Sequence, residues 1–170
     1  TYGSRATFNS GNTNGHQIVF DPNTAGKFII SFSDRGQSYY GAAIVGTVSG
    51  TTITLGTKTY YESTTTDYQT AAYDSGTANK FVTAWRGYAY SNKGRAVVGT
   101  VSGTSISFGA VVTANNASTS ELELVADPHS STHFALYFRD GGNNDHATVL
   151  ILTRSGTGLS VGSEYTTGTG

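Results

Sequence analysis

Cysteine and methionine are both absent from this 170-residue sequence, which also has only two prolines and a single tryptophan. Without cysteine, the chain has no disulfide and no thiolate metal ligand. Charged residues make up 12% of the chain and the net charge is −1, which excludes the basic surface that nucleic acids and anionic membranes require. No apolar run approaches the roughly 20 residues of a membrane-spanning helix. We therefore predict no nucleic-acid partner and no membrane insertion.

What the chain has instead is glycine, threonine, serine and eleven tyrosines, in an order that repeats. The segment GTVSGT occurs at Gly46–Thr51 and again at Gly99–Thr104, and an altered copy, LTRSGT, occupies Leu152–Thr157. The short apolar tails that follow end in glycines at positions 56, 109 and 162, and Gly3 ends a similar tail, so these glycines lie 53 residues apart. Periods of this size indicate a tandem-repeat architecture.

No segment shows a sustained 3.6-residue apolar period, and each repeat contains four short runs that are typical of strands. Asp-led turns such as Asp21–Gly26 and two-residue hairpins such as Ser49–Gly50 separate the runs. The expected strands are His16–Phe20, Lys27–Ser33, Gly41–Val48 and Thr52–Tyr61, then Gln69–Tyr73, Lys80–Arg86, Gly94–Val101 and Ser105–Ala114, then Leu122–Ala126, His133–Arg139, Ala147–Thr153 and Gly158–Thr167.

Four short antiparallel strands in each ungapped repeat favour an all-β fold made of β-propeller blades. A β-solenoid and a plain β-sandwich are weaker alternatives, because a solenoid coil is usually shorter and a sandwich gives no reason for exact repetition. We predict one propeller-type domain with an outer strand of a preceding repeat at 1–8 and blades at 9–61, 62–114 and 115–170. Because a closed propeller has about four to eight blades, we expect the ring to be closed by oligomerisation or by repeats outside this chain.

The two ends of each blade differ in how much the repeats vary. The Asp-led turns and the Ser-Gly hairpins hardly change, whereas the loops expected at the other end diverge. Varied loops on a fixed scaffold are where binding usually lies. The diverging segments are Asn9–Gly15, Glu62–Tyr68 and Asn116–Glu121 before the first strands, and Asp34–Tyr40, Gly87–Lys93 and Asp140–His146 between the second and third strands.

These loops carry tyrosines beside amides, carboxylates and arginines, a combination that suits a sugar, since a sugar offers both C–H surface and hydroxyl groups. The alternative interpretation is that the tyrosines cover the ends of neighbouring strands. Trp85 is expected in the core, because Phe32 and Phe138 take its place in the other repeats. The candidate ligand-binding residues are Tyr39, Tyr40, Tyr88, Tyr90, Asn92, Arg86, Arg139, Asp140, Asn143, Asn144 and Asp145.

Other chemistry is less well supported by the residues. Arg86 and Arg139 share one repeat position and would suit a carboxylate clamp, although each is as well explained by an ion pair with a nearby aspartate. The four histidines have no metal-ligand spacing, and Asp140–His146 lacks the EF-hand pattern. No nucleophile, zinc-hydrolase or phosphate-loop motif is present. We therefore predict no enzyme activity, no cofactor and no metal.

The whole unit, with GTVSGTSISFG at Gly99–Gly109, an Asp-led turn, KFVTAWR at Lys80–Arg86 and DGGN at Asp140–Asn143, resembles tandem repeats of marine phage tail or fibre proteins and bacterial surface proteins. The resemblance covers nearly the entire chain. A fainter similarity links Asp34–Tyr39 to the second half of the sialidase Asp-box turn, although Phe32 stands where that turn has serine. No sialidase catalytic residue has a counterpart here.

The resemblance implies a virion-associated or extracellular setting. Because the turns are constant at one end of each blade and the loops with tyrosine, asparagine and aspartate vary at the other, the leading hypothesis is a non-catalytic recognition module that binds glycans or cell surfaces in this setting. One alternative is a purely structural spacer whose loops contact neighbouring subunits or repeats. Another is a fragment of a sialidase-like glycosidase, which would require carboxylates that converge on one site.

Overall fold

The computed structural model describes residues 2–166, and Thr1 and residues 167–170, including Thr167 at the end of the last expected strand, lie outside the described residues. The fold is all-β, with 64% of residues in strands and no α-helix within the described range. Two 3-10 helices, η1 and η2, occupy Arg35–Gln37 and Tyr88–Tyr90. No helix in residues 2–166 is long and apolar enough to cross a membrane.

The strands confirm the 53-residue periodicity, since the second, third and hairpin strands of each repeat start 53 residues apart. We call residues 9–61, 62–114 and 115–166 the first, second and third units. The strands are β1 (Thr13–Phe20), β2 (Lys27–Asp34), β3 (Tyr40–Ser49), β4 (Thr52–Leu55), β5 (Thr59–Tyr73), β6 (Lys80–Gly87), β7 (Lys93–Ser102), β8 (Ser105–Phe108), β9 (Val112–Ala126), β10 (His133–Asp140), β11 (His146–Ser155), β12 (Gly158–Val161) and β13 (Tyr165–Thr166).

The GTVSGT segments form the hairpins between the third and fourth strands of the units, as predicted. Ser49 pairs with Thr52, so the two loop residues are Gly50 and Thr51, one position later than expected. Gly50 has φ +59°, and the same value recurs within a degree at Gly103 and Gly156. A positive φ at the first loop residue favours glycine, which explains why this position is invariant.

The fourth strand of each unit is interrupted. In the first unit β4 pairs with the end of β3, and the start of β5 pairs with the beginning of β3. The break lies at Gly56, where a bend was expected. Here Thr57 N donates to Thr104 O of the second unit at 3.0 Å, so the interruption lets one unit bond to the hairpin of the next.

The loops expected at Glu62–Tyr68 and Asn116–Glu121 are not loops, and this prediction was wrong. They lie inside the 15-residue strands β5 and β9. Each long strand pairs first with the third strand of its own unit and then with the second strand of the next. Glu62–Tyr68 contains three threonines and a tyrosine, which favour strands. Asn116–Glu121 has only one such residue, Thr119, and is held in a strand by its pairing with β7 and β10. The unit boundaries predicted at 61/62 and 114/115 therefore fall within continuous strands.

A bulge recurs at one repeat position, once in β1 and once in each of the two long strands. Gly15, Tyr68 and Glu121 lie 53 residues apart, and their φ angles are +45°, +51° and +55°. The register of pairing shifts at these residues where β1 pairs with β2, where β5 pairs with β6 and where β9 pairs with β10. A bulge bends and twists a strand. The bend turns each long strand away from the strands of one unit and toward those of the next.

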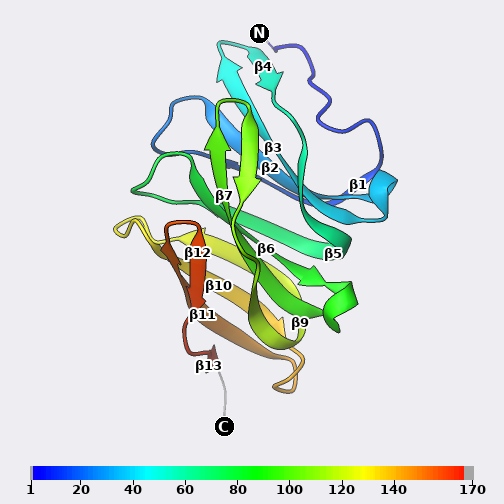
Figure 1. The fold of residues 1–170 in the computed structure, drawn as a ribbon, viewed down its shortest axis with the longest axis vertical. Helices are drawn as coiled ribbons and strands as arrows, with labels where there is room; N and C mark the ends of the chain where they lie inside the picture. The colour runs from blue at the N-terminus through cyan, green and yellow to red at the C-terminus, as the bar shows by residue number, and fades with distance from the viewer. Residues whose placement is uncertain (1, 167–170) are drawn as a thin grey trace.

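The pairing path that results is one open antiparallel sheet of 13 strands. Figure 1 shows the three units following one another along the long axis, so that the two ends of the described chain lie at opposite ends of that axis. The path has two ends and does not close, so a propeller ring is not shown. The confirmed part of the predicted fold class is its all-β, antiparallel character.

The strands of each unit form one segment of this sheet, and the core lies between the segments of successive units. We call the face that a unit turns toward the following unit its downstream face, and the opposite face its upstream face. Ile29 and Val45 on the downstream face of the first unit pack against Phe81 and Trp85 on the upstream face of the second. The second and third units pack in the same way. Trp85 is completely buried and its ring lies 4.7 Å from that of Tyr61, which confirms it as a core residue.

A buried chain of hydroxyl groups also links the first two units. Ser31 Oγ lies 3.1 Å from Tyr61 Oη and 2.9 Å from Thr83 Oγ1, and Thr83 Oγ1 donates to Thr70 O at 3.0 Å. Because each hydroxyl has one proton, the direction runs from Tyr61 through Ser31 and Thr83 to Thr70. Burial raises the pKa of Tyr61 well above its usual value, although the hydrogen bonds oppose this effect.

The strand predicted at 1–8 is not formed, since residues 2–12 contain no strand. Phe8 nevertheless packs edge-on against Phe32 with 5.1 Å between ring centroids. This contact is the counterpart, 53 residues earlier, of Tyr61 against Trp85. The segment therefore takes the place of a preceding unit's tail. It has no strand because the described chain holds no preceding third strand with which it could pair.

Candidate functional site

The loops between the second and third strands share one backbone shape although their sequences differ. Two consecutive residues near the end of each loop adopt positive φ angles between +51° and +63°. For residues other than glycine this conformation is uncommon, so its repetition shows that the scaffold fixes the loops. The pairs are Ser38 and Tyr39, Ser91 and Asn92, and Asn144 and Asp145.

Aspartates stabilise the beginning of two of these loops. Asp34 accepts from Gly36 N at 3.1 Å and from the Asn9 amide at 3.1 Å. Asp140 accepts in the same way from Gly142 N at 2.9 Å and from the Asn115 amide at 3.0 Å. Both carboxylates are buried. Asp140, a predicted ligand-binding residue, therefore has a structural role in the loop.

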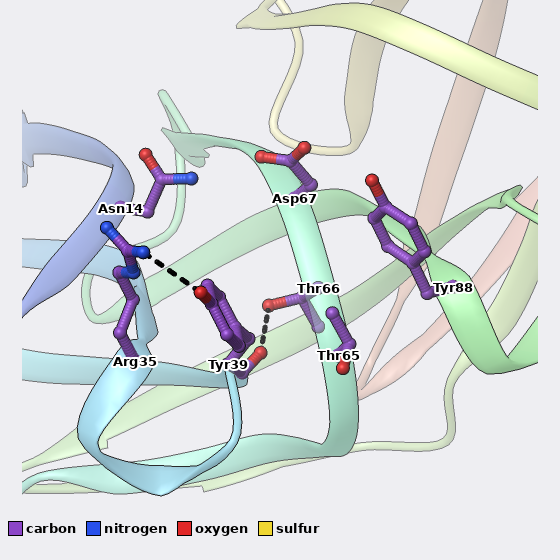
Figure 2. Close-up of a pocket in the computed structure, with 7 residues that line it drawn as sticks. All are labelled: Asn14, Arg35, Tyr39, Thr65, Thr66, Asp67 and Tyr88. Atoms are coloured by element: carbon purple, nitrogen blue, oxygen red, sulfur yellow. Dashed lines mark hydrogen bonds between the residues drawn. The ribbon is translucent and has the colours of Figure 1, made fainter.

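A pocket of about 340 Å³ lies where the first and second units meet. Figure 2 shows its lining side chains, which come from β1, the η1 loop, β5 and η2. Two of the predicted candidates, Tyr39 and Tyr88, reach it from different units. The lining residues are Asn14, Arg35, Tyr39, Thr65, Thr66, Asp67 and Tyr88.

Tyr39 is held at one wall of the pocket by its backbone and by Arg35. Its carbonyl oxygen accepts from Thr66 N at 2.9 Å and from Thr66 Oγ1 at 3.0 Å. Arg35 Nη2 donates to the Tyr39 hydroxyl at 3.0 Å, and the guanidinium lies 5.1 Å from the ring centroid. No acidic side chain among residues 2–166 forms an ion pair with Arg35. Arg35 therefore gives this wall an uncompensated positive charge.

Arg86 organises the opposite wall. It forms an ion pair with Asp67 at 3.0 Å and donates to the Tyr88 hydroxyl at 2.6 Å. Its guanidinium also lies 4.7 Å from the Tyr68 ring and 4.6 Å from the Tyr88 ring. Cation–π contacts of this kind contribute about 0.5–1 kcal/mol each at exposed sites. Tyr88 is therefore oriented although its side chain remains half exposed.

The arginine clamp considered from the sequence is not formed. Arg86 pairs with Asp67, whereas Arg139 pairs with Asp145 at 2.8 Å in the third-unit loop. This outcome matches the alternative interpretation of local ion pairs.

The other predicted residues lie outside the pocket. Tyr40 packs edge-on against Tyr60, with 5.9 Å between their rings. The Tyr90 ring lies 3.9 Å from the Arg95 guanidinium. Asn92 accepts at its carbonyl oxygen from Thr119 N, and the Asn143 amide donates to Thr166. Asn144 and Asp145 belong to the third-unit loop and do not line the pocket.

Sequence reasoning missed Arg35, Asn14 and the run Thr65–Asp67. The run was assigned to a loop, so its alternating strand orientation was not considered. A usable signal was present in the arginine–tyrosine spacings, since Arg35 and Tyr39 are four residues apart and Arg86 and Tyr88 are two apart. Both spacings bring a guanidinium against a phenol ring in the structure.

A second polar cluster lies at the outer side of the first unit. Lys58 Nζ contacts Asp34 Oδ2 at 2.6 Å, and the Tyr60 hydroxyl donates to the same oxygen at 2.9 Å. Burial tends to raise the pKa of Asp34, but hydrogen bonds from Lys58, Tyr60 and Asn9 outweigh it and lower the pKa. Burial likewise tends to lower the pKa of Lys58, but its bond to Asp34 raises the pKa. Both groups are thus held in their charged forms.

Within residues 2–166, no three histidine, aspartate or glutamate side chains are grouped closely enough to hold a metal ion. Comparison of the chain with protein-family models, with curated proteins and with solved structures gave no match.

Proposed function

We propose that this protein is a non-catalytic recognition module that binds a glycan in the pocket between Tyr39 and Tyr88. The observation that carries the proposal is the lining itself, in which two partly exposed phenol rings face a space of about 340 Å³ together with amide, hydroxyl and charged groups. Aromatic faces pack on sugar C–H surface, while the Asn14 amide and the Thr65 hydroxyl suit sugar hydroxyls. Arg35 adds a site for a negatively charged substituent.

The absence of catalysis is part of the proposal. Glycoside hydrolysis normally needs two carboxyl groups that flank the bond to be cleaved. The pocket lining contains one, Asp67, and that carboxylate is paired with Arg86. This composition favours binding over the sialidase-like alternative.

We also propose that the units are blades of a propeller. In support, among strands of successive units that are not hydrogen-bonded to each other, the most extensive contacts are made by the first strands, β1 with β5 and β5 with β9, as expected for blades that converge on an axis. A virion-associated or extracellular location is proposed from the resemblance of the repeats to phage tail or fibre and bacterial surface proteins.

The test is the replacement of Tyr39 and Tyr88 by alanine together, because both line the pocket, followed by binding measurements on a panel of immobilised glycans and on host cells. Tyr165→Ala is the matched control, because Tyr165 is a highly exposed tyrosine outside these loops. We expect the double variant to lose at least tenfold in affinity while the control binds normally. If the double variant binds as well as the unaltered protein, the proposal is wrong.

A purely structural role is the second candidate, and the sheet faces that remain exposed at the two ends of the chain favour it. If the unaltered protein binds neither glycans nor cells, and its loops are buried in an assembly, this alternative replaces recognition.

A further inference from the structure

The downstream face of the third unit lacks the partner that the same face has in the other two units. Val45 and Val98 are 2% and 0% exposed, but their counterpart Ile151 is 41% exposed. Ser31 and Ala84 are fully buried, whereas their counterpart Tyr137 is 43% exposed. The chain thus places large apolar side chains at positions that are core in the first two units.

This exposed face is also hollowed. Ala72 is 7% exposed in the second unit, while its counterpart Val125 is 55% exposed. Val125 lines a largely apolar cavity of about 430 Å³, which lies open on the surface of β9, β10 and β11. The cavity lining comprises Val125, Ala126, Asp127, Pro128, His133, Ala135 and Ile151.

The upstream face of the first unit is also exposed where the same face of the second unit is buried. Ile18 and Phe20 are 54% and 57% exposed, although their counterparts in the second unit, Ala71 and Tyr73, are 2% and 4% exposed. Phe8 covers Phe32 on this face but leaves Ile18 and Phe20 uncovered. Each end of the chain therefore presents one half of an interface that the chain forms twice internally.

The Asp-led turns show the same incompleteness. Asp21 Oδ2 accepts from Asn79 N of the second unit, and Asp74 Oδ2 binds Arg154 of the third at 2.7 Å. Asp127, the third member, accepts from His129 N in its own turn. Within residues 2–166 its second oxygen has no hydrogen-bond partner.

We infer that a second copy of this chain occupies these ends, with the downstream face of the third unit packed on the upstream face of the first unit of the other copy. The occupant follows from continuity, since the two faces are the unfilled halves of the interface seen between the first and second units and between the second and third. Such a contact is heterologous, so it forms a closed ring when the rotation closes and an open stack when it does not.

The copy that docks through its third unit carries Tyr165 at the end of that unit. Docking brings this Tyr165 toward the position that residues 2–8 of the other copy occupy on its first unit. Tyr165 pairs with Val149 just as Thr59 pairs with Ala43 in the first unit. The N-terminal segment, which forms no strand, is therefore displaced on docking. This association does not involve Tyr39 or Tyr88 and is independent of the glycan pocket.

The first experiment is the solution mass of the full chain by analytical ultracentrifugation, in a series reaching about 100 μM so that micromolar association is detected. We expect an assembly of two or more chains of 17.8 kDa. The control is Ser107→Lys, because residue 107 and its counterparts Thr54 and Ser160 are exposed in all three units.

The second experiment uses two variants, each blocked at one end. Phe20→Glu damages the upstream face and Ile151→Lys damages the downstream face, and both side chains are exposed in the single chain, so folding is retained and is checked by thermal unfolding. Each variant alone should have an association constant at least tenfold lower than that of the unaltered chain. An equimolar mixture should form a complex that contains one copy of each variant and grows no further. The intact downstream face of Phe20→Glu can pack on the intact upstream face of Ile151→Lys, and no other intact pair of faces remains.

A monomer at all concentrations overturns the inference. So does association that neither variant weakens, or a mixture of the two variants that forms no complex. Ser107→Lys should associate like the unaltered chain.

Discussion

Gly56 of the first unit lies directly against the carbonyl oxygen of Thr104 in the hairpin of the second unit, so a Cβ atom at position 56 would overlap it. Gly3 meets Thr51 and Gly109 meets Thr157 in the same way. Gly56 and Gly109 are therefore contact points between successive units, and Gly3 makes the same contact from the segment that precedes the first unit. Backbone reaches backbone there, and the neighbouring Thr57 N–H bonds to the same carbonyl at 3.0 Å.

The first prediction concerns this contact. Gly56→Ala should lower the free energy of unfolding by about 1–3 kcal/mol, the usual cost of overpacking, because neither backbone can move freely. The measurement is urea denaturation. Gly162→Ala is the matched control, since its nearest neighbour, Ile151 O, lies 3.0 Å from an added Cβ and it has no following hairpin within the described chain. An equal loss for both variants would contradict the role of Gly56.

The second prediction concerns the hydroxyl chain between the first two units. Thr83→Val keeps the shape of the side chain but removes the group that bridges Ser31 and the Thr70 carbonyl. A buried polar group left without a partner costs about 1–3 kcal/mol, so we expect a loss of that size in urea denaturation. Thr54→Val, at an exposed position, should change little. A Thr83→Val variant as stable as the unaltered protein would show that water or a rearrangement replaces the bond.

The third prediction concerns pH. The folded pKa of Asp34 is lowered, so its contribution to stability is present above its unfolded pKa of about 3.9 and is lost as pH falls through the folded value. Lys58→Met should destabilise the protein by about 1–3 kcal/mol at neutral pH, because a buried carboxylate loses a charged hydrogen-bond donor. The difference between the two proteins should shrink below about pH 4. Denaturation at several pH values measures it, and a difference that does not vary with pH would be inconsistent with this assignment.

The fourth prediction separates Arg86, which orients the pocket residue Tyr88, from its repeat counterpart Arg139. Arg86→Lys keeps the charge but loses the planar group that lies over Tyr68 and Tyr88, so glycan affinity should fall about fivefold, corresponding to about 1 kcal/mol. Arg139→Lys makes the same change where the arginine pairs with Asp145 outside the pocket and should leave affinity unchanged. Isothermal titration with a glycan selected from the panel measures both. Equal effects would show that Arg86 has no special part in glycan binding.

The sequence by itself determined the local features of this protein. The 53-residue repeat, the strands on either side of each Asp-led turn, the glycine hairpins and the burial of Trp85 follow from short-range patterns and from comparison of one unit with the next. The loop tyrosines also identified the general region of the pocket. Local conformational preference and the alternation of side chains suffice for such features.

The tertiary structure alone decided which strand pairs with which. Glu62–Tyr68 is polar enough to suggest a loop, yet it lies in β5, where it pairs with β3 of the first unit and with β6 of the second. The pocket depends on this arrangement, since Asn14, Arg35 and Tyr88 meet there from distant parts of the sequence. The open ends depend on it as well. Strand pairing joins residues that are far apart in the chain. The stabilisation comes from side chains on the partner strand, and a local sequence pattern does not specify which strand that is.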